Sequence, residues 1–151
     1  SLNRESLSGQ VSIIDVEYAK PESAFAHPNA TVMCQALSWM LQRLQTIADS
    51  STLSTESSHD KTKPVLLELY CGCGAHTMAL LRSGLLKRVA AIEYDKRLVA
   101  ACLENAALNG IRVGQGSCDD SEAVSSVEII TEDAGEWSST TSNTVIAADF
   151  I

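Results

Sequence analysis

The stretch Glu68-Leu-Tyr-Cys-Gly72-Cys-Gly74-Ala-His-Thr77 decides the fold. It ends a short apolar run and leads into a segment of helical period, so it predicts a buried strand, a glycine turn and a helix in succession. The two glycines let the turn bring its backbone close to a ligand, and the helix after it offers free N–H groups. The pattern therefore predicts a βα unit with a ligand site at its turn.

Strands and helices are expected to alternate on both sides of this turn. The expected strands, indicated by short apolar runs, span residues 11–18, 65–70, 88–93, 127–131 and 145–148. Asn29 is expected to cap the first helix and Asp95 the third, which ends at Gly110, while the second covers residues 75–81. This order predicts an α/β fold: a doubly wound, Rossmann-like, mostly parallel sheet with helices on both faces, incomplete at its C-terminal end.

The periodicity also predicts which residues face the core and where the loops lie. The residues expected to face inward are Met33, Leu37, Met40, Leu41, Leu44 and Ile47 in the first helix and Leu98, Val99, Cys102, Leu103 and Ala106 in the third. Three Ser/Thr-rich stretches, residues 49–63, 114–126 and 138–144, predict loops. We divide the chain into a leading strand with a connector, residues 1–22, and a main domain, residues 23–151.

The composition suits one globular domain and excludes several classes. The 151 residues hold 11 Lys and Arg against 19 Asp and Glu, a net charge of -8, which argues against a surface that binds nucleic acid through its phosphates. No apolar run approaches the roughly 18 residues of a membrane span, so no membrane partner is expected. Five cysteines without a disulfide pattern, and no cleavable leader, predict reduced thiols in an intracellular compartment.

The cysteines do not predict a metal site. Cys71-x-Cys73 is too closely spaced for a zinc-binding pair, and no second pair exists. Cys34 and Cys102 are expected in the core, and Cys118 is expected to be exposed in a polar loop.

Three acidic residues are expected at one edge of the sheet. Glu68 precedes the glycine turn, Glu93 ends the next strand, and Asp133 follows the strand at 127–131. Ligands of open α/β sheets bind at this edge, where Glu93 can accept both hydroxyls of a ribose and Asp133 an adenine amine. A carboxylate at Glu68 would repel a pyrophosphate but attract the ammonium group of S-adenosylmethionine. Because Thr77 also replaces the third glycine of the dinucleotide pattern, the residues favour S-adenosylmethionine over a dinucleotide.

The motifs resemble one family. Leu67-Glu-Leu-Tyr-Cys-Gly-x-Gly74, then Ala91-Ile-Glu93, then Asn105-Ala-x-x-Asn109-Gly110-Ile111, are similar to the cofactor domain of the tRNA (uracil-5-)-methyltransferase family, within the class I S-adenosylmethionine-dependent methyltransferases. Phe25-Ala-His27-Pro28-Asn29 is similar to the F-x-Q-x-N segment of that family. The resemblance covers about residues 23–137 and implies methyl transfer to C5 of a uridine in RNA, with tRNA as the implied substrate.

The resemblance also implies cofactor contacts and departures from the family pattern. The implied contacts fall on Tyr70, Glu93 and His27, with Gly72 and Gly74 forming the turn. His27 stands where the family has Gln, and Ala75 stands where it has Asn. His27 keeps a hydrogen-bonding group, whereas the methyl side chain of Ala75 has none.

The catalytic residues of the family are not expected in this chain. The family's D-P-P-R segment, its nucleophilic Cys and its general base Glu would follow the last expected strand. Asp149 stands near the place of the first of these residues, but Phe150 and Ile151 follow it, so we interpret it as a strand-end or linker residue. Two alternatives stay open: a class I methyltransferase that acts on a protein or a small molecule, and a non-catalytic module that binds the cofactor.

Overall fold

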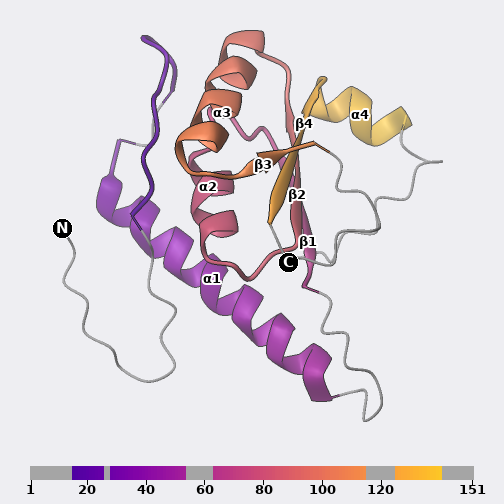
Figure 1. The fold of residues 1–151 in the computed structure, drawn as a ribbon. Helices are drawn as coiled ribbons and strands as arrows, with labels where there is room; N and C mark the ends of the chain where they lie inside the picture. The colour runs from indigo at the N-terminus through magenta and orange to yellow at the C-terminus, as the bar shows by residue number, and fades with distance from the viewer. Residues whose placement is uncertain (1–14, 26–27, 54–62, 115–124, 141–151) are drawn as a thin grey trace.

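The computed structural model describes residues 15–25, 28–53, 63–114 and 125–140 of the chain. The helices are α1 (Ala30–Leu53), α2 (Ala75–Arg82), α3 (Lys96–Leu108) and α4 (Ala134–Thr140), and the strands are β1 (Val65–Leu69), β2 (Arg88–Glu93), β3 (Arg112–Val113) and β4 (Ser126–Thr131). The predicted strand, glycine turn and helix are confirmed as β1, the turn at residues 70–74 and α2. Figure 1 shows these elements around the sheet.

The four strands form one parallel sheet in the order β1-β2-β4-β3. Because β2 lies between β1 and β4, five of its six residues are buried, which explains why its sequence is a continuous apolar run before Glu93. The parallel register brings the carboxyl ends of β1, β2 and β4 to the same edge. The predicted Rossmann-like α/β class is therefore confirmed.

One core joins the sheet to the helices. The apolar face of α1 is confirmed, because Leu37, Leu41 and Leu44 are buried in the same cluster as Met78 of α2 and Val89 of β2. Helix α1 packs against α2, and α2 and α3 contact each other as well as β2. Helices α2 and α3 therefore lie on the same face of the sheet (Figure 1), and helices on its second face stay a prediction.

The predicted helix caps are confirmed. Asn29 accepts a hydrogen bond from the backbone N–H of Val32 at 3.0 Å, and Asp95 accepts one from that of Arg97 at 2.9 Å. Helix α3 ends where Gly110 adopts a left-handed φ of 65°. These local signals place the helix ends correctly because each depends on residues adjacent in sequence.

The leading strand predicted at residues 11–18 is wrong for its described part. Residues 15–18 belong to no strand, and residues 11–14 lie outside the described residues. The backbone of this segment pairs with the side chains of Asn105 and Asn109 on α3 instead of with a neighbouring strand. The apolar run predicted that a neighbouring strand would supply these hydrogen bonds, but side-chain amides supply them instead.

The predicted loops are wrong at their ends. Helix α1 continues through residues 49–53, where the Ser50 hydroxyl bonds back to the carbonyl of Thr46 within the helix. Helix α4 occupies 134–140, so residues 138–140 are helical, and β4 begins at Ser126. Residues 63, 114 and 125 belong to no helix or strand, as predicted. Residues 54–62, 115–124 and 141–144 lie outside the described residues, as does the strand predicted at 145–148.

Two positions expected in the core are exposed. The side chain of Leu103 on α3 is 41% exposed, and Cys34 on α1 is also exposed. Helical periodicity predicts which side of a helix a residue lies on, but it does not predict how wide the buried face of the helix is. Both residues lie outside the buried face of their helices.

Candidate functional site

The turn after β1 follows an unusual backbone path. Tyr70, Gly72 and Gly74 all have positive φ, at 58°, 60° and 79°. A positive φ is uncommon for a residue with a side chain, and such strain clusters at ligand sites. The Cys71 N–H donates to the carbonyl of Ile92 on β2 and the Gly74 N–H to that of Cys71, which fixes the turn at the sheet edge.

The two glycines serve different purposes. A Cβ atom at Gly74 would lie 2.5 Å from Sγ of Cys102, so this glycine lets the turn pack tightly on α3. A Cβ atom at Gly72 would meet nothing within 4 Å. The backbone at Gly72 therefore borders open space, where a ligand can approach it closely.

Glu93 connects the carboxyl end of β2 to the turn. Its side chain is buried, at 5% exposure, and its Oε2 accepts a hydrogen bond from the Gly72 N–H at 3.0 Å. Its Oε1 accepts from the N–H groups of Tyr94 and Asp95, each at 2.9 Å. A carboxylate has about four acceptor positions, so about one remains for a ligand. The two ribose bonds expected from the sequence would therefore require one backbone bond to be released.

Glu68 lies on β1 beside the first turn of α2. The Thr77 hydroxyl donates to Oε2 of Glu68 at 2.6 Å, and Nδ1 of His76 lies 3.9 Å from Oε1. Burial raises the pKa of Glu68 to about 7, and the bond from Thr77 partly opposes this rise. Glu68 is thus a carboxyl group that changes its charge near neutral pH.

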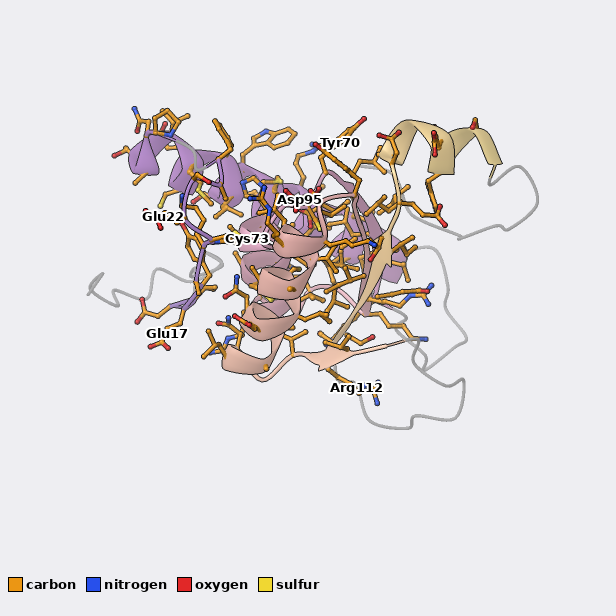
Figure 2. The ribbon with its side chains drawn as sticks, turned by 90° about the horizontal axis from the view of Figure 1, so that it is seen from above. Glu17, Glu22, Tyr70, Cys73, Asp95 and Arg112 are labelled. Atoms are coloured by element: carbon orange, nitrogen blue, oxygen red, sulfur yellow. The ribbon has the colours of Figure 1, made fainter. Side chains whose placement is uncertain are left out.

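The other predicted site residues are less closely associated. Tyr70 lies directly before Cys71 in the turn and is 65% exposed. Figure 2 shows it at the upper edge of the molecule. Asp133 is exposed, and its Oδ1 accepts from the N–H groups of Gly135 and Glu136, so it caps α4. His27 and Asp149 lie outside the described residues.

Two polar residues of this region were not assigned a role from the sequence. Thr77 was considered only as a replacement for a glycine, although a hydroxyl one helical turn after a glycine turn can reach an acid on the strand before it. Asn105 appeared only within a motif, yet it is fully buried and donates to the carbonyl of Cys73 at 2.8 Å. A polar amide on an otherwise apolar helix face is the feature of the sequence that could have indicated this role.

The three cysteines around the turn are buried. They are Cys71, Cys73 and Cys102, at 7%, 8% and 0% exposure. The neighbouring Cys102 thiol and burial raise the pKa of Cys71 far above its usual range, and burial raises that of Cys73. The Cys71 and Cys73 thiols are therefore protonated at neutral pH.

The parallel sheet, the glycine turn and the buried acid at the end of β2 define a Rossmann-like α/β domain with a ligand edge at its strand ends. The family described as tRNA (Uracil-5-)-methyltransferase matches residues 2–115. The chain belongs to this family, as its motifs indicated.

Curated relatives have the same description. The chain is 35% identical over 113 residues to the tRNA/tmRNA (uracil-C(5))-methyltransferase of Idiomarina loihiensis, covering 74% of this chain and 26% of the relative. It is 31% identical over 119 residues to that of Campylobacter concisus, covering 74% and 28%. The chain thus spans about a quarter of the length of these relatives.

One solved structure was also compared. The crystal structure of the SAM Dependent Methyltransferase from Agrobacterium tumefaciens has a TM-score of 0.47 and 14% sequence identity, covering 72% of this chain and 26% of that one. Separately, none of the helices that the structure describes combines the length and the apolar character required to cross a bilayer.

Proposed function

We propose that this chain is the S-adenosylmethionine-binding part of an RNA uridine-C5 methyltransferase that acts on tRNA. The observation that carries the proposal is the hydrogen bond from the Gly72 N–H to Glu93, which joins the glycine turn to the acid on β2 in a chain of this family. The relatives' descriptions supply the proposed substrate, a uracil in tRNA or tmRNA. The net charge of -8 leaves RNA binding to rest on this family relationship.

The residues at the turn fit this cofactor. Gly72 borders open space, so the cofactor's methionine end can approach the backbone, and Glu93 has an acceptor position for a ribose hydroxyl. Glu68 would face the ammonium group, directly or through water, and Tyr70 offers an exposed ring beside the turn. The bound cofactor supplies an activated methyl group for transfer.

The chain's own contribution is to bind and orient. Glu93 would fix the ribose, and the turn would fix the methionine end, so that the reactive group points in one direction. Glu68 would lose its proton as the cationic cofactor binds, because a neighbouring positive charge lowers the pKa of a carboxyl group. His27, Asp133 and the domain division at residue 22 stay part of the proposal.

Calorimetric titration tests the cofactor. S-adenosylhomocysteine and NAD are titrated separately into the chain, and we expect the former to bind more tightly because Glu68 disfavours a pyrophosphate. Tighter binding of NAD would contradict the proposal. The substrate is tested separately with the full-length protein: methyl transfer to a protein or a small molecule but not to unmodified tRNA would support the alternative class I enzyme.

A further inference from the structure

Two buried asparagines hold the segment at residues 17–19 in the way that a strand would: Asn105 of α3 and Asn109, the C-cap that follows this helix. Oδ1 of Asn105 accepts from the Ala19 N–H at 2.7 Å, and its Nδ2 donates to the Ala19 carbonyl at 2.9 Å. Oδ1 of Asn109 accepts from the Glu17 N–H at 3.3 Å, and its Nδ2 donates to the Glu17 carbonyl at 2.6 Å. Side chains four residues apart on a helix thus pair with backbone groups two residues apart, both on one side of an extended segment.

The two asparagines differ in what else they contact. The second amide hydrogen of Asn105 goes to the carbonyl of Cys73, which lies between the two glycines of the turn. That of Asn109 goes to the carbonyl of Asn105 within α3. Of these two asparagines, only Asn105 therefore joins the segment at 17–19 to the glycine turn. Figure 2 shows the chain passing from Glu17 to Glu22 alongside α3 toward Cys73.

Both hydrogens of the Asn105 side-chain amide donate to backbone carbonyls, and the side chain is fully buried. Loss of this amide would leave the carbonyls of Cys73 and Ala19 without a buried donor, so the turn and the segment would both relax. The same turn holds Gly72, whose N–H reaches Glu93. A shift at Cys73 would therefore reach its neighbour Gly72 within the turn.

We infer that Asn105 is a positioning residue that couples the segment at 17–19 to the glycine turn, so that docking of this segment and binding of the cofactor strengthen each other. The inference rests on the proposed function for the identity of the cofactor. Coupling of this kind is reciprocal: if the docked segment favours the ligand, the ligand must favour the docked segment. Asn105 itself does not have to touch the cofactor.

The test compares Asn105→Ala with Asn109→Ala. The second variant also removes an amide side chain that binds the segment at 17–19, but it removes no hydrogen bond to the glycine turn. Dissociation constants for S-adenosylhomocysteine are measured by calorimetry, well below the melting temperature of each variant. We expect Asn105→Ala to weaken binding by about tenfold or more and Asn109→Ala by less than about threefold. Equal weakening by the two variants would overturn the inference, because a general loss of packing predicts that result.

A second measurement uses only the wild-type chain, so its result does not depend on whether a variant folds. Amide hydrogen exchange of the wild-type chain is followed by NMR with and without S-adenosylhomocysteine. We expect the ligand to slow exchange of the Ala19 N–H, which lies on Asn105 and outside the site. Unchanged exchange at Ala19 in the saturated protein would overturn the inference.

The two proposals fail in distinguishable ways. If the wild-type chain does not bind S-adenosylhomocysteine, the proposed function fails, and exchange in the free protein still tests the coupling. Asn105→Ala should then speed exchange at both Ala19 and Gly74, whereas Asn109→Ala should act at Glu17 alone. Exchange at Gly74 that does not respond to Asn105→Ala would overturn the coupling itself.

Discussion

At the scale of single residues, Glu93 is expected to contribute most to the site. Glu93→Ala removes the acceptor of three backbone N–H groups, including that of Gly72 in the turn. Hydrogen bonds to a charged group contribute about 1.5–3 kcal/mol each, so we expect cofactor binding to weaken by at least about tenfold in a calorimetric titration. The control is Glu104→Ala, which removes an exposed carboxylate of α3 that has no role in the proposed site. Glu93→Ala that binds like the wild type would refute this role.

Glu68 is expected to make stability depend on pH. Its pKa is about 7 in the folded chain, mainly because of burial, against an ordinary value of 4.5. Since the folded state holds this proton more tightly, the contribution of Glu68 favours folding at low pH and is lost as the pH rises from about 4.5 to 7. The difference reaches about 3 kcal/mol at most.

Urea unfolding across this pH range measures the effect. In Glu68→Gln the loss of stability between pH ~4.5 and ~7 should be absent, because the amide does not titrate. Glu104→Gln, at an exposed position of α3, is the control for changing a carboxylate to an amide. A wild-type profile that matches that of Glu68→Gln would contradict the raised pKa.

The sequence predicted part of this site because strand ends can be located from apolar runs. It placed Glu68, Glu93 and the glycine turn at one edge, and the structure joins Gly72 to Glu93 there. It did not predict that backbone groups occupy most of the Glu93 carboxylate, or that Asp133 caps α4, because both depend on local geometry that residue types do not specify. The contact of Asp133 with a ligand stays a prediction.

At the scale of elements, the contact between the turn and α3 is expected to tolerate no side chain at residue 74. Gly74→Ala combines a left-handed φ of 79° with a Cβ atom 2.5 Å from Sγ of Cys102. The φ alone costs about 1–2 kcal/mol, and overpacking adds about 1–3 kcal/mol, so we expect a fall of several kcal/mol in the free energy of unfolding.

A double-mutant cycle separates these two costs. Gly84→Ala, with a φ of 73° and nothing near its Cβ position, should show the backbone cost alone. Combining Gly74→Ala with Cys102→Ala should recover part of the loss, because the sulfur is gone. If the two changes are simply additive in chemical unfolding, the close approach to Cys102 is not what requires glycine.

The elements that the sequence predicted correctly are those with a local signal. Strands β1, β2 and β4 are apolar runs, and α3 carries its cap and its terminal glycine in sequence. Short β3 and α4 were missed because two residues give no period and a Ser-rich helix resembles a loop. The leading segment was misassigned because its partners, Asn105 and Asn109, lie about 90 residues away.

At the scale of the whole molecule, the available thiols are separated from the chemistry that the family implies. Cys71, Cys73 and Cys102 are buried, with the pKa raised at the first two, and the exposed Cys34 lies on α1. Attack on C6 of a uracil requires a thiolate at the substrate, with a base near C5. The three buried cysteines do not meet this requirement, and Cys118 lies outside the described residues.

We therefore expect this chain by itself to bind the cofactor without methylating RNA. Its 11 basic residues against 19 acidic ones also leave little to hold a phosphate backbone, so added tRNA should bind weakly and lose that binding as salt increases. The measurement is transfer of a radiolabelled methyl group to bulk unmodified tRNA, with a full-length relative as the positive control. Incorporation by the chain that disappears when any one of its five cysteines is changed to Ser would place the nucleophile inside this chain and overturn the expectation.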